Sequence, residues 1–94
     1  MAEAIWIGID VAKRHLDVAI SETGPVRRYP NTPAGHRRLL VALEAVAVAG
    51  IVLEATGAYH QGLMATLGAQ GYAPTALNPQ WFKAFKRSAG KRAK

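Results

Sequence analysis

The sequence predicts an α/β fold built on a mixed sheet with helices on its faces, and three observations lead to this prediction. An apolar run of strand length, residues 4–11, opens the chain, and another, residues 51–55, follows later. Residues 15–21 alternate between apolar and polar side chains, as a half-buried strand does. Thr32-Pro33 and Asn78-Pro79 each place a capping side chain before a proline, which is typical of a helix start.

The remaining elements follow from turns and caps. The short link Ala12-Lys13-Arg14 favours an antiparallel hairpin, and Gly24-Pro25 marks a turn. Thr56 caps the second helix and Gly71 ends it. The predicted elements are strands at 4–11, 15–21 and 26–30, a helix from 33 to about 47, a strand at 51–55, a helix at about 58–70, a strand at 72–77 and a helix from 79 to about 88. The apolar residues expected to face the core from the first two helices are Leu39, Leu40, Leu43, Val46, Ala47, Leu63, Met64 and Leu67.

This order, β-β-β-α-β-α-β-α, is the order of the ribonuclease H-like fold, to which RuvC-like domains belong. In that fold the first and fourth strands lie side by side and parallel. Asp10 ends the first apolar run and Glu54 ends the run Ile51-Val52-Leu53-Glu54. Both carboxylates are therefore expected at one edge of the sheet, where open α/β sheets bind their ligands.

A carboxylate buried alone is costly, so a pair of them at strand ends favours a bound metal ion or a shared site. Hard oxygen ligands suit Mg²⁺ or Mn²⁺, which act on phosphates. Asp10 and Glu54 are accordingly the predicted metal ligands and catalytic residues. The alternatives are a turn amide as the partner of Asp10 and the N-terminus of the following helix as the partner of Glu54.

Composition narrows the class of protein. The 94 residues allow one domain, and half of them are hydrophobic, so a disordered chain is not expected. There is no cysteine, which excludes disulfides and thiolate metal sites and fits a cytoplasmic location. No apolar run approaches the roughly 18 residues of a membrane span, and no signal peptide is evident.

The net charge of +6 is unevenly spread, with no acidic residue after Glu54. A basic tail over residues 83–94 favours nucleic acid as a partner, and a solvated chain end is the alternative. Lys13 and Arg14, which follow the first strand, are further candidates for phosphate contact, or else an ordinary exposed turn. The tail candidates are Lys83, Lys86, Arg87, Lys91, Arg92 and Lys94.

Three motifs in order resemble the IS110-type transposases. The segments Gly8-Ile9-Asp10-Val11-Ala12-Lys13 and Leu16-Asp17-Val18-Ala19 are similar to the opening of these proteins. The segment from Leu53 to His60 is similar to their second motif, and Asn78-Pro79 with the stretch up to Lys94 is similar to the approach to their third. Each motif alone is weak, but three in register over nearly the whole chain are specific.

The resemblance implies an N-terminal RuvC-like domain with a DEDD set of acids, in which Asp10 matches the first acid and Glu54 the second. It implies DNA transposition and recombination of an insertion sequence, a guide RNA, an oligomeric assembly and a separate C-terminal domain with a serine nucleophile. The family's third acid follows the lysine that Lys94 matches. We therefore expect residues 1–94 to be a single, partial transposase domain that is inactive alone.

Other polar and aromatic residues are interpreted as structural. Asp17 is expected away from Asp10, solvated or paired with a basic residue, and His15 and His36 are expected on the surface. His60 lies near Glu54 in the sequence and could be a ligand or a proton carrier. A lone histidine is more often structural, so His60 is interpreted as a structural residue. Trp81, Phe82 and Phe85 have the spacing of core residues, with base stacking as the alternative.

Three other functions remain open. The chain could be a nucleic-acid-binding module without catalysis, which salt dependence of binding would reveal. A RuvC-type nuclease shares the chemistry, but the stretch Thr56-Gly57-Ala58-Tyr59-His60 favours the transposase. A sugar kinase or actin-like ATPase can open with a similar Gly-Ile-Asp, yet Val11-Ala12-Lys13 lacks the glycine that follows the aspartate there.

Overall fold

A computed structural model describes residues 4–20, 24–54 and 57–77. Their elements run in the order β-β-β-α-β-α-β, as predicted for this part of the chain. They are β1 (Ile5–Val11), β2 (His15–Ala19), β3 (Val26–Pro30), α1 (Pro33–Glu44), β4 (Val48–Glu54), α2 (Gln61–Ala69) and β5 (Thr75–Leu77). The helix predicted from residue 79 and the basic tail lie outside the described residues.

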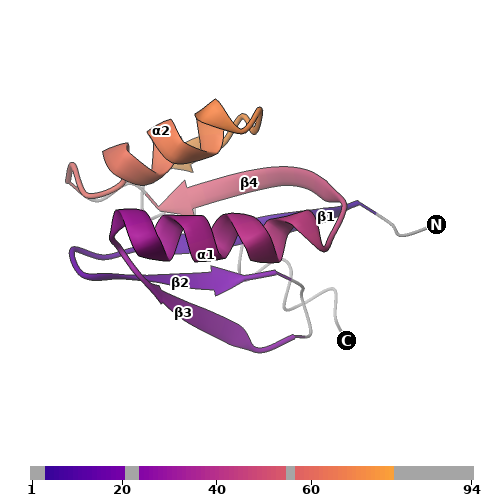
Figure 1. Cartoon of the computed structure of the whole chain (residues 1–94), viewed down its shortest axis with the longest axis horizontal. Helices are drawn as coiled ribbons and strands as arrows, with labels where there is room; N and C mark the ends of the chain where they lie inside the picture. Colours follow the sequence, from indigo (N-terminus) through magenta and orange to yellow (C-terminus); the bar gives the residue numbers. More distant parts are fainter. Residues whose placement is uncertain (1–3, 21–23, 55–56, 78–94) are drawn as a thin grey trace.

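The strands form one mixed, five-stranded sheet in the order β3-β2-β1-β4-β5. Figure 1 shows β3, β2, β1 and β4 of this sheet. Strand β2 is antiparallel to both β1 and β3, while β4 is parallel to both β1 and β5. The hairpin between the first two strands and the parallel contact of the first and fourth strands are thus confirmed. This arrangement is the α/β, ribonuclease H-like sheet that the sequence predicts.

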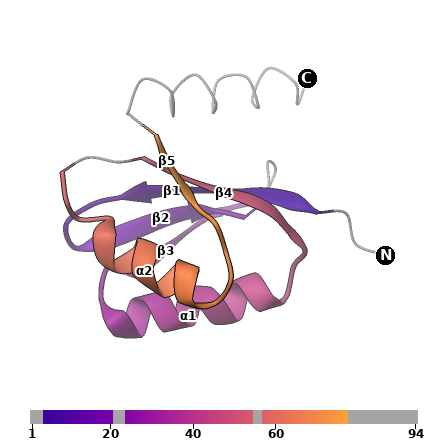
Figure 2. The same ribbon diagram turned by 90° about the horizontal axis from the view of Figure 1, so that it is seen from above.

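Both described helices lie on the same face of the sheet (Figure 2). Their inward side chains join those of the strands in one buried cluster: Ile7, Ile9, Val11, Leu16, Val18, Tyr29, Leu39, Leu43, Ile51, Leu53, Leu63 and Leu67. Side chains alternate along a strand, so every second residue of β1 belongs to the other face. Trp6 and Asp10 therefore lie on the face away from α1 and α2.

The start of α1 is fixed by local chemistry. The side chain of Thr32 accepts a hydrogen bond from the backbone N–H of Gly35 at 3.1 Å, and Pro33 occupies the first turn. Gly35 lets the first turn lie against the end of β3, because a Cβ at this position would meet the backbone oxygen of Pro30. The predicted cap is thus confirmed, and it seats the helix directly after β3.

Several element bounds differ from the prediction. Helix α1 ends at Glu44, before the predicted residue 47, and Ala47 is exposed. Strand β4 begins at Val48, before the predicted residue 51, because Val48 and Gly50 already pair with Ile5 and Trp6 of β1. Helix α2 begins at Gln61 and β5 at Thr75, so both are shorter than predicted. Gly71, with a φ of 90°, follows the end of α2 as predicted.

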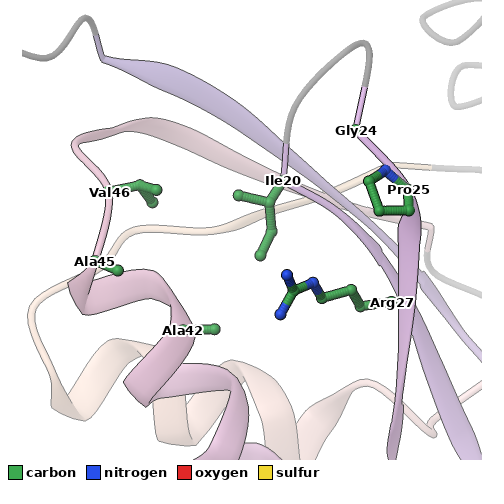
Figure 3. Close-up of a pocket in the computed structure, with 7 residues that line it drawn as sticks. All are labelled: Ile20, Gly24, Pro25, Arg27, Ala42, Ala45 and Val46. Carbon is green, nitrogen blue, oxygen red and sulfur yellow. The ribbon is translucent and has the colours of Figure 1, made fainter.

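An open hollow of about 290 Å³ lies between the end of α1 and the start of β3. The side chain of Arg27 extends from β3 into this hollow toward the last turn of α1 (Figure 3). None of the described helices has the length and apolar character needed to span a membrane.

Candidate active site

The two predicted metal ligands lie side by side. In the parallel register of β1 and β4, Asp10 is the partner of Glu54, one position after the pair Ile9 and Leu53. Ile9 and Leu53 are fully buried beneath the helices, so Asp10 and Glu54 lie on the opposite face. Both acidic residues are half-buried. The prediction that strand pairing brings these two positions to one edge of the sheet is therefore confirmed, while their chemical role stays a prediction.

A third carboxylate lies in the same row. Asp17 is the register partner of Asp10 on the other side of β1, so the expectation that the hairpin separates them is wrong. The hairpin link is only Ala12 to Arg14, which places the start of β2 directly beside the end of β1. Asp17, Asp10 and Glu54 thus follow one another across three adjacent strands, β2, β1 and β4.

Asp17 forms a salt bridge with an arginine, in agreement with the expectation that it is solvated or paired with a basic residue. Nε of Arg28 donates to Oδ1 of Asp17 at 2.8 Å, and an NH2 nitrogen of Arg28 donates to Oδ2 at 3.2 Å. The two residues are register partners of β2 and β3. The hydrogen bond to Asp17, and then its negative charge, raise the pKa of Arg28 above its usual value. The cation thereby offsets one of the carboxylates in the row.

The loops that follow the two central strands carry polar groups. Lys13 and Arg14 are exposed in the turn after β1, which suits either the phosphate contact or the ordinary turn that the sequence leaves open. After β4, Gly57 has a φ of 66° and leads into a turn that contains the exposed Tyr59. His60 follows, and within the described part of the chain its buried Nδ1 has no hydrogen-bond partner. His15 is half-buried on β2.

His36 is buried, so the expectation of a surface histidine is wrong. Its Nε2 lies 2.7 Å from Oδ1 of Asn31, and its ring packs near Gly62 at the start of α2. Burial lowers the pKa of His36 below its usual value. His36 lies one turn before Leu39 and Leu40 on the buried stripe of α1, so its spacing was a signal that the sequence interpretation did not use.

Asp10 and Glu54 offer part of the ligand set that a divalent cation needs. Two adjacent carboxylates supply the hard oxygen ligands that Mg²⁺ and Mn²⁺ prefer, and Mg²⁺ commonly keeps several waters. Among the described residues, however, no cluster of three or more His, Cys, Asp or Glu has a geometry that could hold a metal. Asp10 and Glu54 therefore fit as a partial ligand set, completed by water or by groups outside the described ranges. The six basic candidates from Lys83 to Lys94 lie outside those ranges too.

A mixed sheet with this strand order, with two acidic residues paired at the ends of the adjacent parallel strands β1 and β4, is that of a ribonuclease H-like domain. The model of the IS110 family with a DEDD domain, described as a transposase, matches residues 7–94. The chain therefore belongs to the IS110 family of DEDD transposases. None of the curated proteins matches the chain.

Proposed function

We propose that this domain uses Asp10 and Glu54 to bind Mg²⁺ or Mn²⁺ and to act on a DNA phosphate during transposition. The observation that supports this proposal is the parallel register in which Asp10 and Glu54 are direct partners on the face of β1 and β4 away from α1 and α2. Membership of a transposase family supports DNA as the substrate. The proposal thus joins the site's chemistry to the family's reaction.

Each residue has a distinct part in this proposal. The carboxylates of Asp10 and Glu54 hold the cation against the phosphate from adjacent strands. A divalent cation bound there would polarise the phosphate, stabilise its developing charge and assist a hydroxyl nucleophile. Lys13 and Arg14 contact backbone phosphates beside the site, since both are exposed in the turn that follows Asp10 by a few residues. The basic residues from Lys83 to Lys94 extend this contact along the nucleic acid.

The same proposal includes partners that the family suggests. A C-terminal transposase domain supplies the nucleophile and further ligands, a guide RNA selects the DNA, and the assembly contains several copies. Two carboxylates can hold one cation weakly, with waters as its other ligands. A two-metal site, with ions about 3.5–4 Å apart, needs more ligands than Asp10 and Glu54 supply. We therefore propose that residues 1–94 alone do not cut or join DNA.

The experiment that tests the metal site is a Mn²⁺ titration of the chain followed by calorimetry or by the EPR signal of free Mn²⁺. Asp10→Asn and Glu54→Gln each remove one charge and should weaken binding strongly. Glu44→Gln is the matched control, because Glu44 is an exposed acid at the end of α1 and its loss changes the net charge equally. If all three variants bind Mn²⁺ with the affinity of the parent chain, the metal site is refuted.

The chemistry is tested in an intact IS110 transposase that contains this domain. Asp10→Asn and Glu54→Gln should abolish recombination of a plasmid carrying the element's ends, whereas Glu44→Gln should leave it intact. Recombination at an unchanged rate in either site variant would contradict a catalytic role for that carboxylate.

A second candidate function is nucleic-acid binding without catalysis. The exposed Lys13 and Arg14 in the turn after β1 support it. With about five phosphate contacts, the logarithm of the binding constant should fall with a slope near −4 to −5 against the logarithm of salt concentration. Strong salt dependence together with no effect of Asp10→Asn on recombination would favour this candidate over the metal-dependent enzyme.

A further inference from the structure

One side chain, Asn31, connects the two loops that follow the acidic pair. Its Nδ2 donates to the backbone oxygen of Ala12 at 2.9 Å and to that of Tyr59 at 3.0 Å. Ala12 comes shortly after Asp10, in the turn after β1, and Tyr59 comes shortly after Glu54, in the turn after β4. A single nitrogen therefore joins the segment beyond one carboxylate to the segment beyond the other.

The connection lies just past the carboxyl ends of the two strands. Among the described residues, Asp10 and Glu54 form the last register pair of β1 and β4. Further along the chain, Ala12 and Tyr59 belong to two separate turns. The two hydrogen bonds from Asn31 join the turns again on the far side of the carboxylates.

The neighbours of Asn31 determine how its amide is oriented. Both Ala12 and Tyr59 present carbonyl oxygens, which only accept hydrogen bonds, so the NH₂ group of Asn31 must face them. Its Oδ1 then faces Nε2 of His36 at 2.7 Å. Because Oδ1 only accepts, Nε2 of His36 must carry the hydrogen and donate. With its hydrogen on Nε2, His36 supports the same amide orientation that both loop contacts require.

The backbone of Asn31 is anchored as well. Its N–H donates to the backbone oxygen of Arg14 at 2.9 Å, next to the turn after β1. Asn31 directly precedes Thr32, which caps α1, and the first turn of α1 is seated against Pro30 through Gly35. The donor is thus held by the start of a helix whose own position is fixed by the sheet.

We propose that Asn31, oriented by His36, is a positioning residue for Asp10 and Glu54. It sets the spacing of the two acids by clamping together the turns that follow β1 and β4. This inference rests on the proposed role of the two acids as metal ligands. Asn31 touches neither carboxylate in this arrangement and acts only through the backbone at Ala12 and Tyr59. Groups that orient metal ligands in this indirect way commonly change metal affinity by about 10- to 100-fold when they are removed.

The geometry of the clamp can be measured without any metal. The chain has no cysteine, so cysteines at Lys13 and Tyr59, which are both exposed, accept nitroxide labels selectively. EPR then gives the distribution of distances between the two turns. Asn31→Ala and the isosteric Asn31→Asp both remove the two donated hydrogen bonds, and each should broaden the distribution.

Thr32→Ala is the matched control for the clamp. It removes the cap of α1 from the neighbouring position and lowers stability, but it leaves both loop contacts of Asn31 in place. The label distribution should therefore stay narrow in this variant. A distribution in the Asn31 variants as narrow as that of Thr32→Ala would overturn the clamp.

Variants of His36 give a second test if the Asn31 variants do not fold. His36→Gln keeps an N–H donor for Oδ1 of Asn31, whereas His36→Leu removes it. The label distribution should be narrow with glutamine and broad with leucine. Equal distributions in these two variants would contradict an orienting role for His36.

The effect on the site is measured by Mn²⁺ titration of the same unlabelled variants. Asn31→Asp should bind Mn²⁺ at least about tenfold more weakly, and Thr32→Ala should bind it as the parent chain does. If Asp10→Asn abolishes binding while Asn31→Asp matches the parent chain, the positioning role is wrong. If Asp10→Asn has no effect on Mn²⁺ binding, the metal proposal fails instead, and the label distances alone decide whether Asn31 fixes the turns.

Discussion

Asp10 and Asp17 are direct partners in the antiparallel pair of β1 and β2, and the guanidinium of Arg28 holds the Asp17 carboxylate through two hydrogen bonds. Like charges directly opposite each other on one face of a sheet are destabilising. Arg28 therefore compensates a repulsion that lies inside the candidate active site. The pair Asp17–Arg28 belongs to the electrostatics of that site although neither residue is a predicted ligand.

Replacing Arg28 should reveal this compensation. Arg28→Gln should lower the melting temperature at pH 7, because it removes the cation that holds the Asp17 carboxylate while the charges of Asp10 and Asp17 stay opposite each other. The loss should shrink near pH 3, where carboxylates become protonated, and it should also shrink in high salt. Thermal unfolding by circular dichroism at the two pH values measures this difference.

A double-mutant cycle separates the pair from its surroundings. Adding Asp17→Asn to Arg28→Gln removes the second negative charge, so the double variant should be more stable at pH 7 than Arg28→Gln alone. If the two substitutions simply add, Arg28 and Asp17 do not interact energetically and the compensation is absent.

The buried His36 should make stability depend on pH. Burial lowers the pKa of His36 in the folded chain below its usual value of 6.5, so the unfolded chain takes up a proton first as pH falls. The contribution of neutral His36 to stability is therefore present above pH 6.5 and is lost as pH falls toward the lower folded pKa. A single site limits this slope to about 1.4 kcal/mol per pH unit.

Urea unfolding at pH 7.5 and 5.5 measures the effect, with His36→Gln as the comparison. The variant keeps a hydrogen-bond donor for Asn31 but has no titrating group at this position. Its free energy of unfolding should change less between the two pH values than that of the parent chain. An identical pH dependence in the variant and the parent chain would show that His36 does not cause the effect.

A pair of glycine substitutions tests the seating of α1 on β3. Gly35→Ala should destabilise the chain by about 1–3 kcal/mol, because the added methyl group meets the Pro30 backbone, which cannot move as a side chain can. Gly68→Ala in α2 is the matched control, since no atom lies within 4 Å of its added Cβ. It should stabilise the chain by up to about 1 kcal/mol through helix propensity. Denaturant titrations of both variants give the two signs, and a gain in the first would contradict the close approach.

Metal should stabilise the folded chain if the candidate site is correct. A ligand that binds only the folded state at ten times its dissociation constant adds about 1.4 kcal/mol. Mn²⁺ should therefore raise the melting temperature, EDTA should reverse the shift, and Glu54→Gln should abolish it. An equal shift in Glu54→Gln would place the metal somewhere else on the chain.

Much of the fold could be predicted because its signals are local. The Ile-rich run of β1, the short hairpin link and the Thr32-Pro33 cap each determine one element, and the structure confirms each of them. Boundaries that depend on tertiary contact were less predictable. Strand β4 gains its first residues from pairing with β1, and α2 loses the turn before Gln61 to a loop.

The candidate site was predicted where it follows from strand order and missed where it follows from register. Parallel neighbours bring Asp10 and Glu54 together whatever the details of the turns. The neighbour of Asp10 on β2 depends on the turn length, and so Asp17 was misplaced. The contacts of Asn31 and His36 depend on how α1 and α2 pack, so they could not be predicted in detail. The presence of two polar residues, Asn31 and His36, at the start of α1 was nevertheless a usable signal that they interact.

The parallel contact between β1 and β4 also has a consequence for the biosynthesis of this chain. The hairpin partner of β1 follows at once in the sequence, but its other neighbour is made only after β2, β3 and α1. Until then the isoleucine-rich β1 has an open edge toward the position of β4, and such edges can pair with other chains. On the ribosome, the stage most prone to aggregation should therefore end when β4 emerges and completes the acidic pair.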